Sequence, residues 1–322
     1  MVKLLNSAFL AALLLASSAS NPRWVSAAEG PLPPQNLRCE YLRDPLGIDV
    51  KLPRFSWVLE HTERGEKQTA YQLLVATRPE LLAQDKGDAW DSGKISSDHS
   101  TQVVYSGKAL ESTRTYYWKV RAWDTQGKTS AYSLPEQFEM GLLSAGEWES
   151  QWIQGGSELR KEFSIPGKIV RARAYVTALG YYELRLNGQK VGTNVLDPAW
   201  TTYEKRILYI TYDITSQLHE GANTVGVMLG NGWAVPPQHY GPPIATTFSS
   251  PALLLQIQVE LDGGKQLTIL SDPTWKAARG PITGDSIYDG ETYDATRETP
   301  GWDLPGFDDS AWQAAQARPS RP

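Results

Sequence analysis

The sequence predicts an all-β protein in which two β-sandwiches follow one another. Short segments alternate apolar and polar residues along most of the chain, and Val, Ile, Leu, Tyr and Trp fill their apolar positions. Gly, Asn, Asp and Pro stand between these segments, where turns are expected. No amphipathic run is long enough for a large helix. Strands joined by turns, without long helices, are typical of sandwich folds.

The first series of strand-like segments lies within residues 31–142. It follows the Pro-rich stretch Pro31–Pro34 and comprises PRFSWVLE, YQLLVAT, TQVVYSG, TYYWKVRAWD and SLPEQFEMG. Leu110, Tyr116, Trp118, Val120 and Ala122 recur at the interval seen in fibronectin type III domains, with Trp57 as the opposing core residue. We therefore predict a fibronectin type III-like sandwich, interrupted by a short helical turn or loop near residues 79–90.

The second series begins near Trp148 and runs to about residue 316. Its segments are RKEFSI, RARAYVTAL, YYELRLNG, RILYITYDIT, NTVGVMLG, ALLLQIQVEL and KQLTILS. Asn187-Gly188 predicts a tight hairpin turn because both central residues of such a turn need positive φ. Asp262-Gly263-Gly264 predicts a second hairpin. These signals indicate a jelly-roll, galactose-binding-like sandwich over residues 145–316.

The first 28 residues have the layout of a secretory signal peptide. Lys3 precedes an apolar run over residues 8–16, and Ser26-Ala27-Ala28 offers small residues at a cleavage site. We therefore expect an exported protein, periplasmic or extracellular. Cleavage leaves 29 basic against 36 acidic residues. This balance predicts no nucleic-acid partner, and no later segment is apolar enough to predict a membrane helix.

Cys39 is the only cysteine, so the sequence excludes an internal disulfide despite the expected export. It stands between Leu37 and Tyr41 in a strand-like alternation. A buried, unreactive thiol is the preferred interpretation over a nucleophile.

Aromatic and amide or acidic side chains gather at the turns between Ala178 and Trp233. A sugar ring offers an apolar face and a rim of hydroxyls, so rigid loops that carry flat rings beside carboxylates suit it. The sequence therefore favours sugar binding. Signals for other chemistry are missing: there is no GxSxG elbow and no phosphate loop, and His61, His99, His219 and His239 lack zinc spacing.

Four motifs resemble the N-terminal modules of bacterial α-L-rhamnosidases. They are GYYELRLNGQKVG, LDPAWTTYEKRILYITYDIT, GANTVGVMLGNGW and SDPTWKAARGPITGDSIYDGETYDA. The resemblance covers nearly all of residues 36–316. It implies a fibronectin-like sandwich and a jelly-roll module, followed in the family by a catalytic barrel of paired helices, which we expect to be missing from this sequence. It also implies rhamnose-containing glycans as partners, in some members beside a calcium ion.

The resemblance and the chemistry of the side chains together give two sets of candidate residues. The carbohydrate-binding candidates are Asp197, Trp200, Asn231, Trp233, Tyr288, Glu291, Tyr293 and Asp294. The calcium candidates, chosen as hard oxygen donors, are Asp197, Asn231, Asp289, Glu291 and Asp294. Asn187 and Tyr203 belong to the same motifs.

Each of these candidates also has a purely structural interpretation. Asn187, Asp197 and Asn231 stand where they could simply form turns. Trp200 and Trp233 could pack under the sandwich, and the run YDGETYDA could be a solvated loop.

The chain departs from the family pattern in three places. Thr296 stands where an Arg usually follows the Tyr-Asp-Ala triplet, and Ala234 replaces an aromatic residue after Trp233. The rigid loop VPPQHYGPP, with His239 and Tyr240 at its tip, follows directly. These differences put the sugar specificity in doubt.

Three functions stay open at this point. The first is a secreted, non-catalytic pair of carbohydrate-binding and spacer modules of an α-L-rhamnosidase. The second is a purely structural scaffold of that hydrolase. The third is an autonomous glycoside hydrolase, in which Asp289, Glu291 and Asp294 would supply the required carboxyl pair. Carboxylates this close in sequence are more simply ion ligands or loop surface, so we expect no catalysis by this chain alone.

Overall fold

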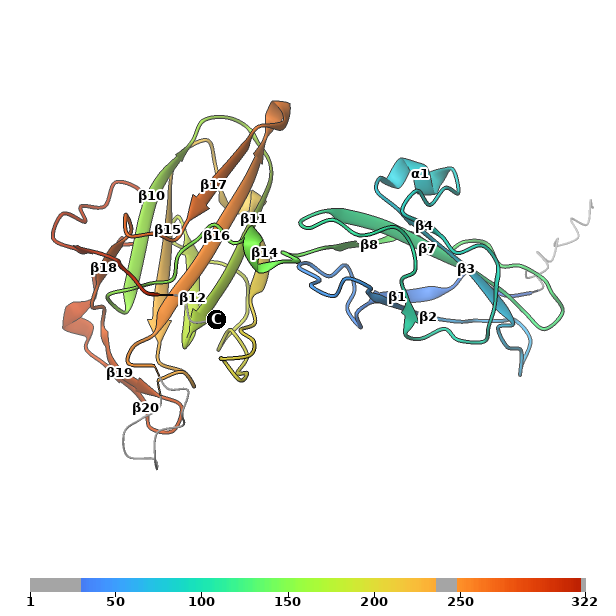
Figure 1. The fold of residues 1–322 in the computed structure, drawn as a ribbon, viewed down its shortest axis with the longest axis horizontal. Helices are drawn as coiled ribbons and strands as arrows, with labels where there is room; N and C mark the ends of the chain where they lie inside the picture. Colours follow the sequence, from blue (N-terminus) through green and yellow to red (C-terminus); the bar gives the residue numbers. More distant parts are fainter. Residues whose placement is uncertain (1–29, 236–247, 320–322) are drawn as a thin grey trace, which may run out of the picture.

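The structure, a computed structural model, describes residues 30–235 and 248–319 of the 322-residue chain. Two β-structured bodies lie side by side (Figure 1), which confirms the all-β prediction. The predicted signal peptide, and His239 and Tyr240 of the Pro-rich loop, lie outside the described residues. Within the described ranges, no helix has the length and apolar character needed to cross a membrane.

The first body packs a three-stranded sheet on a larger one. The small sheet has the order β1-β2-β6, and the large one has the order β4-β3-β7-β8 with β5 added beside β3. The strands are β1 (Gln35–Cys39), β2 (Arg54–Val58), β3 (Ala70–Ala76), β4 (Trp90–Asp91), β5 (Ile95–Ser96), β6 (Val103–Val104), β7 (Thr115–Trp123) and β8 (Glu136–Glu139). Helix α1 (Pro79–Ala83) occupies the region predicted to hold a helical turn.

The aromatic residues predicted for the first core are buried there. Trp57 is 2% exposed and Trp118 is 1% exposed, and both belong to the cluster between the two sheets. The Tyr116 hydroxyl accepts a hydrogen bond from the Glu111 N–H at 2.9 Å, which fixes the corner before β7. Burial raises the pKa of the Cys39 thiol, so the thiolate is suppressed and the thiol is unreactive, as predicted.

The second body consists of two six-stranded sheets and a separate hairpin. One sheet has the order β13-β12-β15-β10-β18-β21, and the other has the order β14-β11-β16-β9-β22 with β17 beside β16. The elements are η1 (Ala145–Glu147), β9 (Ile153–Gln154), β10 (Glu158–Ile165), β11 (Ile169–Leu179), β12 (Tyr181–Leu186), β13 (Gln189–Lys190), β14 (Ile210–Asp213), η2 (Thr215–Gln217), β15 (Gly221–Gly230), β16 (Ala252–Leu261), η3 (Asp262–Gly264), β17 (Gln266–Leu270), β18 (Lys276–Ala278), β19 (Ile282–Ser286), β20 (Gly290–Tyr293), η4 (Ala295–Arg297), β21 (Gln313–Ala314) and β22 (Gln316–Ala317).

Turn chemistry sets the registers of the second sandwich. Asn187 and Gly188 both have positive φ, of 50° and 83°, at the tight turn between β12 and β13. The turn at residues 262–264 joins β16 to β17, as predicted. Inward-facing apolar residues of β11, β15 and β16 fill the space between the sheets and form the larger of the two cores.

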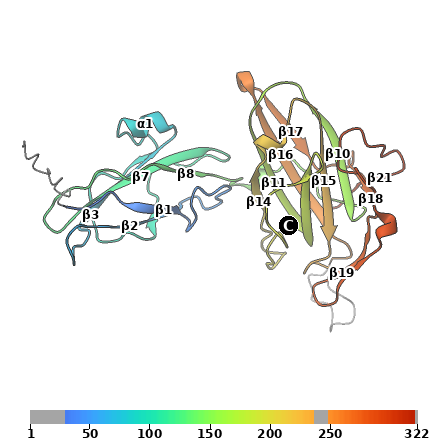
Figure 2. The ribbon, with the colours of Figure 1, turned by 180° about the vertical axis from the view of Figure 1, so that it is seen from behind.

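The junction between the two sandwiches is closed by ion pairs and hydrogen bonds. Glu139, at the end of β8, is 2% exposed and accepts from Arg173 Nε and Nη2 on β11 at 2.9 Å each. Arg171 Nη2 lies 2.6 Å from the same carboxylate. The Tyr209 hydroxyl accepts from the Leu142 N–H at 2.8 Å. Figure 2 shows β11 and β14 facing the first sandwich, while β18, β19 and β21 lie on the far side of the second.

Candidate functional site

The connection between β13 and β14 carries Asp197 and Trp200. Asp197 precedes a cis peptide bond to Pro198. Its carbonyl accepts a hydrogen bond from the Tyr182 N–H at 3.0 Å, and its carboxylate accepts one from the Tyr212 hydroxyl at 3.0 Å. Asp197 thus anchors the connection to both sheets. Trp200, three residues later, is left 57% exposed.

The turn after β15, at residues 231–235, carries Asn231 and Trp233. Gly232 has a φ of +51°, and a Cβ atom there would meet the main chain of Gly180 at 3.1 Å, so the turn is tight against its neighbour. Trp233 is half-buried against a small apolar cluster. That cluster contains Leu179, Tyr203, Ala234 and Ala252.

The hairpin β19–β20 approaches this turn from the other side. Asp285 on β19 and Glu291 on β20 are directly opposite one another in its register. The Asp285 carboxylate accepts a hydrogen bond from the Asn231 N–H at 2.7 Å, and the Asp285 carbonyl accepts one from Asn231 Nδ2 at 3.1 Å. These two bonds hold the turn and the hairpin together.

Three aromatic rings meet where these segments converge. Trp200 and Trp233 are stacked, with ring centroids 5.0 Å apart and an interplanar angle of 22°. Tyr288 stands edge-on to Trp233, at 5.8 Å and 88°. We call these three residues the aromatic cluster. Because Trp200 and Tyr288 are 57% and 56% exposed, the cluster offers flat apolar faces to solvent.

A cavity of about 460 Å³ opens beside the aromatic cluster. Its apolar wall includes Tyr181, Leu196, Met228 and Ile287, and its polar wall includes Asp285 and Glu291. Gly232 and Ile287, which also line it, directly precede Trp233 and Tyr288 in the chain. We call it the rim cavity. Its size and its mixed lining suit a small ligand with both apolar faces and hydroxyl groups.

The acids of the rim cavity repel one another. Burial raises the pKa of the Asp285 carboxyl, the Asn231 N–H lowers it, and the nearby Glu291 carboxylate raises it. Burial also raises the pKa of Tyr181, whose hydroxyl is hydrogen-bonded to the Trp233 side chain. The cavity therefore presents hydrogen-bond acceptors together with neutral phenol groups.

Three further predicted residues in or directly after the hairpin, Asp289, Tyr293 and Asp294, are not among the residues that line the cavity. Asp294 caps η4: its carboxylate accepts from the Thr296 N–H at 3.1 Å and from Arg297 Nε at 3.1 Å. Thr296, which stands where the family usually has an Arg, thus donates a hydrogen bond to the capping carboxylate. The Tyr293 hydroxyl donates to Glu298 at 2.7 Å. Asp289 is exposed in the hairpin turn.

Asn187 and Tyr203, which belong to the same motifs, take structural roles. Asn187 forms the turn after β12, and its Nδ2 donates to the Gln217 carbonyl at 2.9 Å. Tyr203 is 6% exposed and packs against Phe248. The role of Asn187 matches the turn-forming interpretation that the sequence leaves open.

The predicted calcium donors are only partly grouped. Asn231 and Glu291 both adjoin Asp285, whereas the carboxylates of Asp197 and Asp294 are hydrogen-bonded to Tyr212 and Thr296. Carboxylate and amide oxygens are the ligands that Ca²⁺ prefers. The chemistry of the Asp285–Glu291 pair fits such an ion, and calcium stays a prediction.

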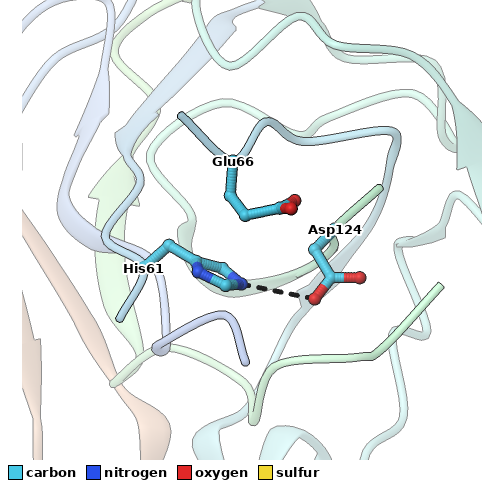
Figure 3. A group of neighbouring side chains, drawn as sticks. All are labelled: His61, Glu66 and Asp124. Atoms are coloured by element: carbon cyan, nitrogen blue, oxygen red, sulfur yellow. Dashed lines mark hydrogen bonds and ion pairs between the residues drawn. The ribbon is translucent and has the colours of Figure 1, made fainter. Parts of the chain in front are cut away.

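Among the described residues, one group of His, Cys, Asp or Glu has three ligand atoms within 4.8 Å of one another, and it lies in the first sandwich. Figure 3 shows its side chains, His61, Glu66 and Asp124, facing one another. His61 Nδ1 accepts a hydrogen bond from the Glu63 N–H at 2.9 Å, so the ring proton is on Nε2. Nε2 faces the Asp124 carboxylate at 3.3 Å, so this nitrogen donates a hydrogen bond and offers no lone pair to a metal.

Sequence reasoning missed Asp285, which joins the two halves of the site. Its motif, GDSIYDGE, contains three acids, and only Asp289 and Glu291 were selected. Tyr181, Glu183 and Lys190 of β12 and β13 were also missed, although they line the rim cavity. Their outward positions in an alternating strand are the signal that could have found them.

Each of the two sandwiches matches a known protein family. Residues 34–144 match the family "Rha78A-like, N-terminal immunoglobulin domain", and residues 167–321 match the family "Alpha-L-rhamnosidase N-terminal domain". The chain is 39% identical over 298 residues to an α-L-rhamnosidase of Formosa agariphila, an alignment that covers 87% of this chain and 32% of that protein.

Two solved structures of α-L-rhamnosidases are also similar to this chain. An α-L-rhamnosidase from Dictyoglumus thermophilum is 41% identical with a TM-score of 0.84, over 89% of this chain and 34% of that one. A Streptomyces avermitilis α-L-rhamnosidase complexed with L-rhamnose is 26% identical with a TM-score of 0.85, over 90% of this chain and 45% of that one. The chain spans between about a third and less than half of the length of the curated relatives that it matches. It belongs to the α-L-rhamnosidase family, of which it contains the N-terminal immunoglobulin-like domain and the rhamnosidase N-terminal domain.

Proposed function

We propose that the second sandwich binds rhamnose-containing glycans at the aromatic cluster and the rim cavity. In this proposal the chain is the N-terminal portion of an exported α-L-rhamnosidase, and a catalytic barrel of paired helices hydrolyses the glycan that the sandwich holds nearby. Presenting a bound ligand next to a catalytic domain raises its effective concentration there. The relative from Streptomyces avermitilis, complexed with L-rhamnose, supports this choice of sugar.

One observation carries the proposal: the exposed ring of Trp200 is stacked on the half-buried ring of Trp233 beside a cavity that contains carboxylates. The rings of Trp200 and Trp233 are stacked with their centroids 5.0 Å apart, and Asp285 and Glu291 lie in the wall of the adjoining cavity. A sugar ring can lie on the indole faces while its hydroxyl groups donate hydrogen bonds to the carboxylates.

Replacing Trp200 with alanine tests this site with little effect on the core, because Trp200 is 57% exposed. We expect Trp200→Ala to weaken the binding of a rhamnosyl oligosaccharide by a factor of about 5 to 100, since loss of one stacked ring costs about 1–3 kcal/mol by analogy with other ring-stacking sites. Isothermal titration calorimetry measures the Kd, with Ca²⁺ and with a chelator; the calcium prediction expects tighter binding with Ca²⁺.

The matched control is Tyr41→Ala, which removes an aromatic residue that is 51% exposed in the first sandwich. It should leave the Kd unchanged. If the wild-type chain gives no binding heat with the sugar, with or without calcium, the proposal is wrong.

A second candidate function is a structural scaffold that docks against the catalytic barrel and binds no sugar. Exposed apolar residues around the rim favour it, because such patches also mark protein interfaces. Val195, Leu196, Trp200 and Tyr288 are 72%, 67%, 57% and 56% exposed. The same titration decides between the two candidates, since the scaffold predicts no binding heat for any rhamnosyl ligand.

The chain by itself is expected to release no nitrophenol from an aryl α-L-rhamnoside. Glycoside hydrolysis uses two carboxyl groups that flank the scissile bond. Asp285 and Glu291 are opposite residues of a two-stranded ribbon, so their side chains project from the same face and line one wall. Absorbance at the nitrophenolate maximum measures the release. A rate above the buffer blank that Glu291→Gln abolishes would show that this chain is an enzyme.

A further inference from the structure

Among the described residues, the charged side chains around the rim cavity are three acids and one base. They are Glu183, Asp285, Glu291 and Lys190. Lys190 Nζ lies 3.3 Å from Glu183, and Arg185 Nη1 lies 2.8 Å from the same carboxylate. Glu183 therefore forms ion pairs with both nearby cations, and the Lys190 charge is neutralised in the ligand-free protein.

Asp285 and Glu291 have no such compensation. In the part of the chain that the structure describes, no Lys or Arg forms an ion pair with either carboxylate. The two groups are opposite residues of the β19–β20 hairpin, and both line the cavity.

This wall treats neutral and acidic sugars differently. A hydroxyl group donates a hydrogen bond to a carboxylate, whereas the carboxylate of a uronic acid can only accept and brings a further negative charge close to two others. The partly enclosed cavity screens this repulsion less than bulk water does. The polar groups that remain, such as Asn194 and Ser286, are uncharged.

We propose that the rim cavity, when no cation is bound between its carboxylates, selects uncharged glycan residues and rejects uronic acids, with Asp285 and Glu291 as the residues that determine this selectivity. The inference rests on the proposed sugar-binding function and specifies its ligand class. The selectivity applies to the sugar unit that enters the cavity. The neighbouring unit of the same glycan lies on the aromatic cluster.

The test compares two ligands of the same linkage, a rhamnosyl-hexose and the corresponding rhamnosyl-hexuronate. Calorimetry at pH 7, with a chelator that removes calcium, measures both Kd values in low salt and in high salt. We expect the neutral ligand to bind about tenfold or more tightly in low salt, and the ratio to shrink in high salt as the charges are screened. The double variant Asp285→Asn/Glu291→Gln keeps the side-chain shapes and should bring the ratio close to one.

The matched control is Glu80→Gln/Asp98→Asn, which removes the same number of charges from exposed positions of the first sandwich. It should leave the ratio as in the wild type, which would exclude an effect of net charge alone. Equal Kd values for the two ligands, or a ratio that neither salt nor the double variant changes, would overturn the selectivity and leave sugar binding intact. Failure of both ligands to bind would overturn the proposed function as well.

Discussion

Glu139→Ala is expected to lower the free energy of unfolding by about 3–5 kcal/mol, the usual cost of removing one partner of a buried ion pair. Glu139 is 2% exposed and receives ion pairs from Arg171 and Arg173 of the other sandwich. Without it, Arg173, itself 8% exposed, keeps the Asp213 carboxylate at 2.8 Å as its one charged partner among the described residues. Urea unfolding followed by tryptophan fluorescence measures the change.

The variant should also separate the two sandwiches in the unfolding transition, because these ion pairs cross the junction. Glu111→Ala is the matched control. Its carboxylate lies 2.7 Å from Arg114, but the side chains of this pair are 68% and 40% exposed, so its loss should cost about 1 kcal/mol or less. If the two variants cost the same, the Glu139 pairs do not hold the junction.

A rigid junction changes the role expected for the first sandwich. The sequence suggests a spacer, and a spacer can be flexible. Glu139, the Tyr209 hydroxyl and the pair between Arg206 and Asp49 at 2.8 Å instead join the sandwiches at several points. The first sandwich therefore supports the second in a fixed orientation, which would set the direction in which the aromatic cluster faces.

The fold could be predicted largely because its signals are local. The alternation around Trp118, the turn at Asn187-Gly188 and the hairpin at residues 262–264 each depend on neighbouring residues. The order of strands within each sheet could not be predicted in this way. Strand β15 lies between β12 and β10, so its neighbours are far from it in the chain and depend on packing of the whole sandwich.

The candidate site could be predicted only in part for the same reason. Trp200, Trp233 and Tyr288 were selected as aromatic residues at turns, and the structure brings their rings together. The role of Asp285 depends on its bonds to Asn231, 54 residues away, and no local pattern encodes that contact. The sequence predicts Asp294 as a ligand residue, but its carboxylate caps the helical turn η4 by accepting a hydrogen bond from the Thr296 N–H.

Glu158 is another residue whose environment the sequence does not reveal. It lies on β10 between Met228 of β15 and Ala278 of β18, and it is 2% exposed. Its Oε2 atom is buried and has no hydrogen-bond partner. Burial raises the pKa of this carboxyl to about 7, and the neighbouring Asp303 carboxylate, which is paired with Arg185 at 2.6 Å, contributes to the increase.

Glu158 should therefore make the protein less stable as the pH rises from about 4.5 to about 7. Over this range the folded state keeps a proton that the unfolded state has released, and ionising the buried group costs about 3 kcal/mol in total. Glu158→Gln stays neutral, so its stability relative to the wild type should rise by about that amount between pH 4.5 and pH 8. Comparing the two pH values cancels any constant packing effect of the amide.

Glu162→Gln, on the same strand with a side chain that is 40% exposed, is the control. If both variants show the same pH dependence as the wild type in urea unfolding, Glu158 ionises freely and its burial has no energetic consequence.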